Sequence, residues 1–419
     1  MQKLIIKGNR ELSGKISISG SKNASLPILA ASILANKVKL KNIPLVKDIF
    51  TMIELLNFIG LDTKFIKNKN ILEIKNKEKN INTLAPYKLV KTMRAGVLVL
   101  GSLLTKYGKA KVSLPGGCAI GTRPVDLHLF ALKKLGAKLK IKNGYILAEA
   151  KSGLIGATIK FSSISVGATE NALLAAMMAK GKTILRNCAI EPEITDLISF
   201  LKKLGRKIKI SGRTIIIIGE SKIIKKSISH EVIFDRIEAG TFMIASALIG
   251  KKVIINKIDP NIIRSEIDIL KKMGVKIKKK NNSITLQKNK RLKKINIKTS
   301  PYPGFPTDLQ AQLMVLMTQA NGLSKISENI FENRFMHVPE LKRMGAKIKI
   351  KNKIAFIKGP SKLAGAEVMA TDLRASVSLV LAGLIAENKT IINRIYHLDR
   401  GYEFLETKLK NCNAEIKRI

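Results

Sequence analysis

A pattern of apolar and polar residues recurs six times along the chain. Each copy ends an amphipathic helix with a glycine or an asparagine and continues into a strand in which lysine alternates with apolar residues. The residues that close the six helices, at intervals of 76, 69, 69, 71 and 68 residues, are Gly60, Gly136, Gly205, Gly274, Gly345 and Asn413. Glycine or asparagine at this position is typical of a left-handed helix C-cap. The near-constant interval predicts an internal structural repeat.

Each copy also contains an earlier helix of small apolar residues. These helices are rich in Ala, Leu and Met and carry few charges, which is typical of helices buried on most sides. They are expected at residues 24–35, 95–104, 172–179, 240–249, 311–320 and 375–386. Each unit is therefore predicted to run strand, buried helix, strand, amphipathic helix, strand and strand. Three units can close around their buried helices, so six predict an α/β protein of two pseudo-symmetric lobes, with a repeat too long for the shorter solenoids.

The composition fits a soluble globular protein of two domains. The chain has 419 residues, of which 46% are hydrophobic, and no apolar run approaches the roughly 18 residues of a membrane span. The first eight residues predict a short strand and lack the features of a signal peptide. The three cysteines (Cys118, Cys188 and Cys412) are not at metal-like spacing, so neither a disulfide framework nor a zinc site is implied. We expect no metal and no cofactor. These features favour a reduced, cytoplasmic protein.

The net charge of +46 raises nucleic-acid binding as an alternative function. Lysine outnumbers arginine 61 to 15, however, and the lysines are spread over the polar positions of amphipathic strands such as residues 138–141 and 347–350. Trp is absent and aromatic residues are few, so no base-stacking platform is evident. We therefore expect small-molecule substrates, with no specific nucleic acid and no membrane as partner; the sequence does not indicate an oligomeric state.

Polar side chains gather just before or within the first turn of each predicted buried helix. The set comprises Ser21, Lys22, Asn23, Lys91, Arg94, Thr169, Glu170, Asn171, Asp235, Arg236, Glu238, Thr307, Asp308, Gln310, Asp372 and Arg374. Ordinary capping explains some of them. The cations Lys22, Arg94 and Arg374 are different, because positive charge opposes the dipole at a helix N-terminus. Such departures from a local rule tend to mark functional sites, and here they predict an anion-binding centre.

The segment from Leu114 to Pro124 places Cys118 where a regular helix or strand cannot form. Pro115 lacks a backbone donor, and three glycines lie within six residues. Arg123 follows five residues after the cysteine, near enough in sequence to favour a thiolate or to hold an anion beside it. The alternative interpretation of the segment alone is a glycine turn with an incidental thiol, since most free cysteines are buried and inert.

Five of the 15 arginines lie at helix starts or in loops after strands, namely Arg94, Arg123, Arg334, Arg374 and Arg400. In a chain that uses lysine almost everywhere else, arginine at these places indicates bidentate recognition of phosphate or carboxylate. Structural ion pairs are the alternative, and the neighbouring Asp372 strengthens that alternative for Arg374.

Seven motifs closely resemble the enolpyruvyl transferases, and among them the branch that uses UDP-N-acetylglucosamine. They lie at residues 19–24, 91–95, 114–128, 305–308, 331–335, 370–375 and 399–402, in the family's order, and the resemblance runs from Lys3 to Ile416. It implies a fold of two inside-out α/β barrels of three repeats each, in agreement with the six copies of the pattern. The lobes would be residues 22–232 and residues 1–21 plus 233–419.

The same resemblance implies the reaction. The enolpyruvyl group of phosphoenolpyruvate would pass to the 3-hydroxyl of UDP-N-acetylglucosamine with release of phosphate, by addition and elimination, as the first committed step of peptidoglycan synthesis. Cys118 resembles the general acid, which can also form a covalent adduct with phosphoenolpyruvate. Asp308 resembles the base toward the hydroxyl, or the group that positions it. Because this chemistry must exclude water, closure of the lobes with movement of the Cys118 loop is expected.

Other residues receive substrate-binding roles from the resemblance. Those for phosphoenolpyruvate are Lys22, Asn23, Arg123 and Arg400, of which Lys22 and Arg400 also belong to the catalytic set. Those for the nucleotide sugar are Arg94, Arg123, Pro124, Val125, Asp126, Leu127, Ser163, Ile164, Ser165, Val166, Asp308 and Ile330. Supporting roles fall to Arg334, Asp372 and Arg374. Ser163 departs from the family, which often has lysine there, and a hydroxyl cannot replace that charge beside a diphosphate.

Three alternatives to this function are distinguishable. A 5-enolpyruvylshikimate-3-phosphate (EPSP) synthase shares the fold and the chemistry but has no equivalent of the cysteine loop. An RNA-binding or RNA-end-processing protein built on related repeats is supported by the charge alone. A degenerate, inactive copy is opposed by the intact set of functional residues, which comprises Lys22, Cys118, Asp308, Arg334 and Arg400.

Overall fold

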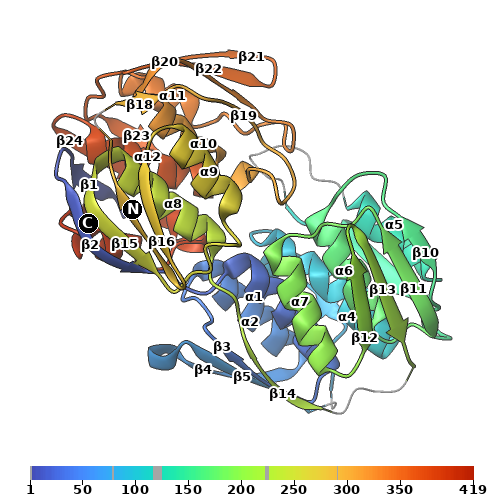
Figure 1. The fold of residues 1–419 in the computed structure, drawn as a ribbon. Helices are drawn as coiled ribbons and strands as arrows, with labels where there is room; N and C mark the ends of the chain where they lie inside the picture. The colour runs from blue at the N-terminus through green and yellow to red at the C-terminus, as the bar shows by residue number, and fades with distance from the viewer. Residues whose placement is uncertain (1, 78–79, 117–124, 222–225, 290) are drawn as a thin grey trace. The chain divides into compact units, whose positions relative to one another are not determined.

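The structure, a computed structural model, describes residues 2–77, 80–116, 125–221, 226–289 and 291–419. The protein is α/β with mixed sheets (Figure 1). Contacts within the chain divide the described residues into two compact units. The first unit contains residues 20–116 and 125–233, and the second contains residues 2–19 and 234–419.

The first unit contains three four-stranded sheets that share one pattern. Their strand orders are β14-β3-β5-β4, β6-β7-β9-β8 and β10-β11-β13-β12. In each sheet the first two strands pair in parallel and the remaining neighbours are antiparallel. The strands are β3 (Lys37–Lys41), β4 (Leu61–Ile66), β5 (Ile71–Asn76), β6 (Leu84–Ala85), β7 (Lys109–Ser113), β8 (Lys138–Lys142), β9 (Tyr145–Glu149), β10 (Thr158–Lys160), β11 (Gly181–Arg186), β12 (Lys207–Ser211), β13 (Thr214–Gly219) and β14 (Ser227–Glu231).

Two kinds of helix accompany these sheets. The inner helices α1 (Lys22–Ala31), α4 (Val99–Tyr107) and α6 (Val166–Ala176) are buried over most of their length, and α4 contacts both of the others. The amphipathic helices α2 (Lys47–Ile59), α5 (Asp126–Lys134) and α7 (Pro192–Lys203) each bury one face. The shorter helices are η1 (Ser32–Leu34), η2 (Lys67–Lys69), α3 (Tyr87–Val90) and η3 (Arg94–Leu98). The core of this unit is therefore formed by small apolar side chains between helices and sheets.

The second unit repeats the sheet pattern. Its strand orders are β2-β15-β17-β16, β18-β20-β22-β21 with β19 also paired to β20, and β23-β24-β1-β25. The strands are β1 (Leu4–Lys7), β2 (Leu12–Ser17), β15 (Gly250–Asn256), β16 (Lys276–Lys280), β17 (Ser283–Gln287), β18 (Leu292–Lys293), β19 (Asn296–Lys298), β20 (Ala320–Ser327), β21 (Lys347–Lys351), β22 (Ile354–Gly359), β23 (Glu367–Met369), β24 (Lys389–Asn393) and β25 (Glu415–Arg418). The parallel pairs are again at one edge of each sheet.

The helices of the second unit fall into the same two kinds. The inner helices are α8 (Arg236–Ile249), α10 (Gln310–Met317) and α12 (Leu373–Ile385), and each contacts the other two. The outer helices are α9 (Arg264–Lys272), α11 (Val338–Arg343) and α13 (Leu405–Lys410). Two short 3-10 helices, η4 (Thr307–Leu309) and η5 (Ile395–Arg400), carry residues of the predicted site.

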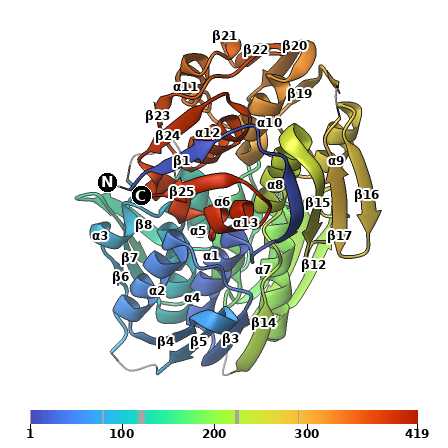
Figure 2. The same cartoon turned by 90° about the vertical axis from the view of Figure 1, so that its left-hand side faces the viewer.

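Strands from distant parts of the sequence complete sheets in both units. In the second unit β1 lies between β24 and β25, with Ile6 opposite Thr390 on one side and opposite Ile416 on the other. Figure 2 shows the blue N-terminal strand β1 beside the red strands of the C-terminus. In the first unit β14 pairs with β3. Each unit therefore closes through pairings that join its two ends.

The predicted left-handed C-caps are confirmed at all six positions. The five glycines have φ between 93° and 111°, and Asn413 has φ 75°. An L side chain with a Cβ adopts this region at a cost, which glycine avoids and asparagine tolerates. The repeat pattern therefore marked the true ends of the amphipathic helices.

One inner helix begins earlier than its small apolar segment at residues 172–179. Helix α6 begins at Val166, because Ser165 caps it by accepting a bond from the amide of Ala168 at 3.3 Å. Thr169, Glu170 and Asn171 therefore lie inside the helix and are buried, instead of preceding it. Asn171 bridges to α4, where its side chain accepts a bond from the amide of Gly101 at 2.8 Å. Asn171, which was predicted as a helix-start group, here joins two buried helices.

The lysine-rich strands have their predicted exposure. All three lysines of β8 and of β21 are exposed. Ile348 of β21 and Ala355 and Ile357 of its partner β22 are buried, whereas Ile350 of β21 is exposed. Within the described ranges, no helix has the length and apolar character needed to cross a membrane.

Candidate active site

Three predicted site residues, Cys118, Arg123 and Pro124, lie outside the described residues. The others divide between the two units. Lys22, Asn23, Arg94, residues 125–127 and residues 163–166 belong to the first unit. Asp308, Ile330, Arg334, Asp372, Arg374 and Arg400 belong to the second.

Lys22 is the first residue of α1 and is nearly buried, with 9% of its surface exposed. A cation at this end of a helix is unfavourable by itself, because the helix dipole is positive there. Its Nζ lies 3.1 Å from Oδ2 of Asp48, which is in the first turn of α2 and is also buried. Asp48 therefore compensates the charge of Lys22 within the fold. No sequence signal had singled out Asp48, since an acidic residue in a first turn is ordinary.

Arg94 begins the 3-10 helix η3, which leads directly into the inner helix α4. It is half-buried, as are Ala95 and Asn23. Gly116 packs against this region: a Cβ there would lie 2.7 Å from the carbonyl oxygen of Lys91. Glycine is therefore required at the point where the chain approaches the predicted Cys118 loop.

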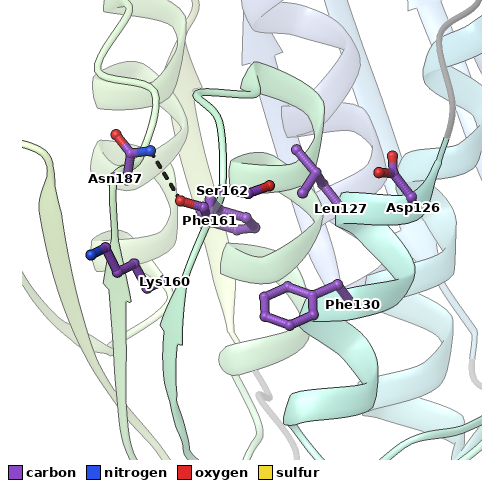
Figure 3. A pocket seen from close by; sticks show the side chains of 7 residues that line it. All are labelled: Asp126, Leu127, Phe130, Lys160, Phe161, Ser162 and Asn187. Carbon is purple, nitrogen blue, oxygen red and sulfur yellow. Dashed lines mark hydrogen bonds between the residues drawn. The ribbon is translucent and has the colours of Figure 1, made fainter.

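A pocket of about 430 Å³ opens in the first unit. It is lined by Asp126, Leu127, Phe130, Lys160, Phe161, Ser162 and Asn187, which come from α5, the end of β10 and the segment after β11 (Figure 3). The side-chain amide of Asn187 donates to the carbonyl of Phe161 at 3.0 Å and so ties two of these segments together. The wall therefore combines the exposed ring of Phe130 with an ammonium group and a carboxylate. Among the predicted residues it contains Asp126 and Leu127.

The predicted diphosphate segment, residues 163–166, follows this pocket wall directly in the chain. Ser163 is exposed, and Ser165 caps α6. The free backbone N–H groups of a helix N-terminus favour anions. Lys160 is exposed three residues before Ser163, and no ion pair joins it to another described residue. Lys160 therefore supplies a positive charge close in sequence to Ser163, the position at which the family often has lysine.

Asp308 forms the centre of the second group, which we call the Asp308 cluster (Asp308, Arg334 and Arg374). Nη2 of Arg334 donates to Oδ1 of Asp308, and Nη2 of Arg374 donates to Oδ2 at 2.6 Å. Each arginine is 7% exposed, whereas a quarter of the Asp308 side chain reaches solvent. The carboxylate raises the pKa of Arg374 against the opposing effect of burial. The cluster presents a carboxylate to solvent while its two cations stay inside.

The structure corrects the expected partner of Arg374. Its ion pair is with Asp308, although Asp372 is close in sequence. Asp372 instead caps α12, because its Oδ1 accepts bonds from the amides of Arg374 and Ala375 at 2.8 and 3.1 Å. The ion-pair alternative thus holds for Arg334 and Arg374, and their common partner is itself a predicted site residue.

The remaining predicted residues lie in loops of the second unit. Arg400 ends η5 and is half-buried. Ile330 is 38% exposed, and its amide donates to Oε1 of Glu328 at 2.8 Å. The same Glu328 accepts a bond through Oε2 from Thr307, which precedes Asp308. Glu328 therefore joins the Ile330 loop to the start of the Asp308 segment.

His337 is a buried titratable group beside the Asp308 cluster. Burial lowers its pKa to about 4, with Asp372 opposing this shift and Arg334 adding to it. Its Nε2 has no hydrogen-bond partner among the described residues, and 2% of the residue is exposed. The imidazole is therefore neutral in the folded protein at neutral pH.

His337 should make the protein less stable in mild acid. An unfolded histidine has a pKa near 6.5, so the unfolded state binds the proton first as the pH falls. We expect the free energy of unfolding to fall by about 2 to 3 kcal/mol from pH 7.5 to pH 4.5 on this account. Urea unfolding of the wild type and of His337→Gln measures it. An equal loss in the two proteins would contradict the assignment to His337.

Comparison with known proteins identifies the family. The family model described as EPSP synthase (3-phosphoshikimate 1-carboxyvinyltransferase) matches residues 6–409. A UDP-N-acetylglucosamine 1-carboxyvinyltransferase of Pelagibacter ubique (strain HTCC1062) is 61% identical, with all of both chains covered. One of Rickettsia prowazekii (strain Madrid E) is 52% identical, again over both full lengths. The chain belongs to the enolpyruvyl transferase family.

Solved structures of enolpyruvyl transferases share the fold. NikO from Streptomyces tendae matches with a TM-score of 0.90 at 24% identity, covering 100% of this chain and 99% of that one. EPSP synthase from Acinetobacter baumannii matches with a TM-score of 0.77 at 19% identity and the same coverage. At these identities the likeness shows the α/β fold of an enolpyruvyl transferase and carries no information about substrate.

Proposed function

We propose that this enolpyruvyl transferase moves the enolpyruvyl group of phosphoenolpyruvate to the 3-hydroxyl of UDP-N-acetylglucosamine and releases phosphate. The observation that carries the proposal is 61% identity over the full length of a relative named for that activity. The product would serve peptidoglycan synthesis. The alternative acceptor, shikimate 3-phosphate, is supported by the family model alone, whose named member lies at far lower identity.

The chemistry consists of two balanced steps. In the addition, C3 of phosphoenolpyruvate takes a proton, C2 bonds to the sugar oxygen, and the hydroxyl loses its proton. In the elimination, C3 loses a proton, the C2–O bond to phosphate breaks, and the double bond forms again. We assign the proton donor to Cys118, and we assign to Asp308 the acceptance of the hydroxyl proton or the positioning of that hydroxyl. The partly exposed carboxylate of the Asp308 cluster supports the second assignment.

Phosphoenolpyruvate requires cations at its phosphate and its carboxylate. We propose Lys22, Arg123 and Arg400 for these groups, with Asn23 beside Lys22. Lys22 is supported by its place at an inner-helix N-terminus, where dipole and charge both attract anions. Its partner Asp48 holds the ammonium group in position at 3.1 Å before an anion arrives.

We propose that the nucleotide sugar binds along the first unit. Arg94, residues 123–127 and the Ser163–Val166 segment would contact it, with Asp308 and Ile330 contributing from the second unit. The pocket supports this proposal, because Asp126 and Leu127 share its wall with Phe130, whose partly exposed apolar ring suits a planar base.

The finer architecture also belongs to the proposal. We propose two inside-out barrels of three repeats, with lobes at residues 22–232 and residues 1–21 plus 233–419. The recurrence of one strand pattern in six sheets of the described chain supports the repeats. We also propose a cytoplasmic location, supported by the buried, unpaired thiols of Cys188 and Cys412.

An acceptor-dependent assay of phosphate release tests the function. With phosphoenolpyruvate present, UDP-N-acetylglucosamine should release phosphate and shikimate 3-phosphate should not. Release with shikimate 3-phosphate alone would replace the proposal by the EPSP synthase alternative. Filter binding at physiological salt tests the alternative of an RNA-binding or RNA-end-processing protein. Tight, end-dependent RNA binding without transferase activity would overturn the enzymatic function.

Lys160 offers a test of the diphosphate segment. If its ammonium group replaces the charge missing at Ser163, Lys160→Ala should raise KM for UDP-N-acetylglucosamine about three- to tenfold and leave kcat nearly unchanged, as expected for one solvent-screened charged contact. Steady-state kinetics measure both constants, with Lys138→Ala on the exposed strand β8 as the matched control.

A compensating variant sharpens this test. Adding Ser163→Lys to Lys160→Ala should return KM toward the wild-type value, because the cation is restored three residues away. An unchanged KM in Lys160→Ala, or equal changes in Lys160→Ala and Lys138→Ala, would show that Lys160 does not bind the substrate.

A further inference from the structure

A buried hydroxyl lies behind the Asp308 cluster. Tyr402 follows the loop of Arg400 by two residues and is 4% exposed. Its hydroxyl lies 2.8 Å from Oγ1 of Thr241 on α8, 3.3 Å from Nε2 of Gln312 on α10 and 3.3 Å from Nη1 of Arg374 on α12. One phenol therefore contacts all three inner helices of the second unit.

The direction of each bond follows from the available hydrogens. Thr241 donates its single hydroxyl hydrogen to the carbonyl of Ile237 at 2.8 Å, so it accepts from Tyr402. The guanidinium of Arg374 and the amide nitrogen of Gln312 can only donate. The phenol oxygen is therefore the acceptor for both. Burial raises the pKa of Tyr402, which keeps the phenol protonated for its bond to Thr241.

Both donors continue to Asp308. Arg374 uses Nη1 for Tyr402 and Nη2 for the carboxylate oxygen Oδ2, which lies at 2.6 Å. Nε2 of Gln312 lies 3.0 Å from the backbone carbonyl oxygen of Asp308, and 3.3 Å from both the Tyr402 hydroxyl and Oγ1 of Thr241. Arg374 therefore connects the Tyr402 hydroxyl to the Asp308 side chain, and Gln312 connects the same hydroxyl to the Asp308 backbone.

We propose that Tyr402 is a positioning residue for the transfer reaction: its hydroxyl holds Arg374 and Gln312 in the arrangement that orients the Asp308 carboxylate. The inference rests on the proposed role of Asp308. Without the hydroxyl, Nη1 of a guanidinium that is 7% exposed loses its acceptor, and an unsatisfied buried charged donor is costly. Arg374 then rotates to find another acceptor for Nη1, and the geometry of its hydrogen bond to Asp308 changes.

Tyr402→Phe isolates this effect, because it keeps the ring over Arg374, whose Cζ lies 5.7 Å from the ring centroid. We expect kcat to fall about tenfold, with KM for both substrates within about threefold of the wild type, because small errors in the placement of a reacting group cost rate. The matched control is Tyr107→Phe in the first unit, which removes a phenol that accepts a bond from Asn76 at 3.1 Å. That variant should keep the wild-type kcat.

A double-mutant cycle separates positioning from a merely structural contribution. If Tyr402 acts through Arg374, the loss of its hydroxyl in an Arg374→Lys background should lower kcat less than twofold further. A structural role would multiply the two effects. Thermal melting of each variant confirms that it is folded at the assay temperature.

The outcomes distinguish this inference from the proposed role of the cluster. A wild-type kcat in Tyr402→Phe, or independent effects of the two substitutions in the cycle, would overturn the role of Tyr402. If Arg374→Lys is impaired in the same experiments, the proposed role of the Asp308 cluster is retained. Full activity in Arg374→Lys would overturn both. If Tyr402→Phe does not fold, Gln312→Met removes the second link and keeps the phenol. It should lower kcat, and an unchanged kcat would overturn the inference.

Discussion

Asp308→Asn is expected to lower kcat at least a hundredfold while the Kd for UDP-N-acetylglucosamine changes by less than about tenfold. An amide cannot accept the proton of the sugar hydroxyl, and general-base contributions are typically about 10²- to 10⁴-fold. Stopped-flow or quench measurement of turnover, with calorimetry for binding, gives the two quantities separately.

The structure makes asparagine the informative replacement at this position. Asp308 neutralises Arg334 and Arg374, each 7% exposed, so alanine would leave two buried cations without their partner. Losses of that kind cost about 3 to 5 kcal/mol of folding stability. Asparagine keeps one acceptor oxygen. Asp62→Asn, which alters an exposed ion pair with Lys77, is the control for a lost surface charge.

Asp308→Asn also distinguishes the two roles open to Asp308, which are to accept the hydroxyl proton and to position the hydroxyl. Both carboxylate oxygens accept bonds from buried guanidinium groups, which suits Asp308 to hold a hydroxyl in place. If Asp308 only positions the hydroxyl, asparagine should retain part of that function and lower kcat about tenfold or less. A pure loss of affinity for the sugar, with kcat unchanged, would remove Asp308 from the chemistry.

Cys118→Ser is expected to abolish turnover almost completely, by about a thousandfold or more, without unfolding the protein. A hydroxyl is a far weaker acid than a thiol, whose ordinary pKa is near 8.5, so proton donation to C3 would be lost. The measurement is single-turnover phosphate release, together with mass spectrometry for a covalent adduct with phosphoenolpyruvate. Wild-type turnover in this variant would exclude Cys118 from catalysis.

The other cysteines provide the control. Burial raises the pKa of Cys188 to about 12, and it raises that of Cys412 as well, so both thiols are unreactive near neutral pH. A thiol-directed epoxide analogue of phosphoenolpyruvate should therefore label Cys118, and faster when the nucleotide sugar is present. Cys188→Ala should retain activity and labelling. Labelling mainly at Cys188 or Cys412 would contradict the prediction of a displayed thiol.

Much of the fold follows from local features of the sequence. The helix-ending glycines lie at positive φ as predicted, and the apolar segments form the inner helices. Helix α6 begins at Val166, ahead of its small apolar segment at residues 172–179, so Thr169 and Asn171 lie inside the helix. Asn171 bonds across to α4, and Thr169 accepts a bond from the amide of Ala189 in the segment after β11. Composition cannot distinguish a capping asparagine from one that bridges two buried helices.

The candidate site was predictable to a smaller extent. Lys22, Arg374 and Asp308 stood out as charges at the starts of apolar helices. Asp48 and Gln312 did not, because each is ordinary for its own segment. Tyr402 lay within a recognised motif, yet its role depends on atoms 28, 90 and 161 residues away in the chain.

The sequence by itself determined the six repeats, the buried and amphipathic helices and the cations at helix starts, because each is set by spacing within a few turns of chain. Tertiary structure alone decided which charges meet. Arg374 pairs with Asp308, 66 residues away, and leaves the adjacent Asp372 to cap α12. That choice depends on how α10 and α12 pack against each other, and a helix period carries no information about the side chains on its neighbour.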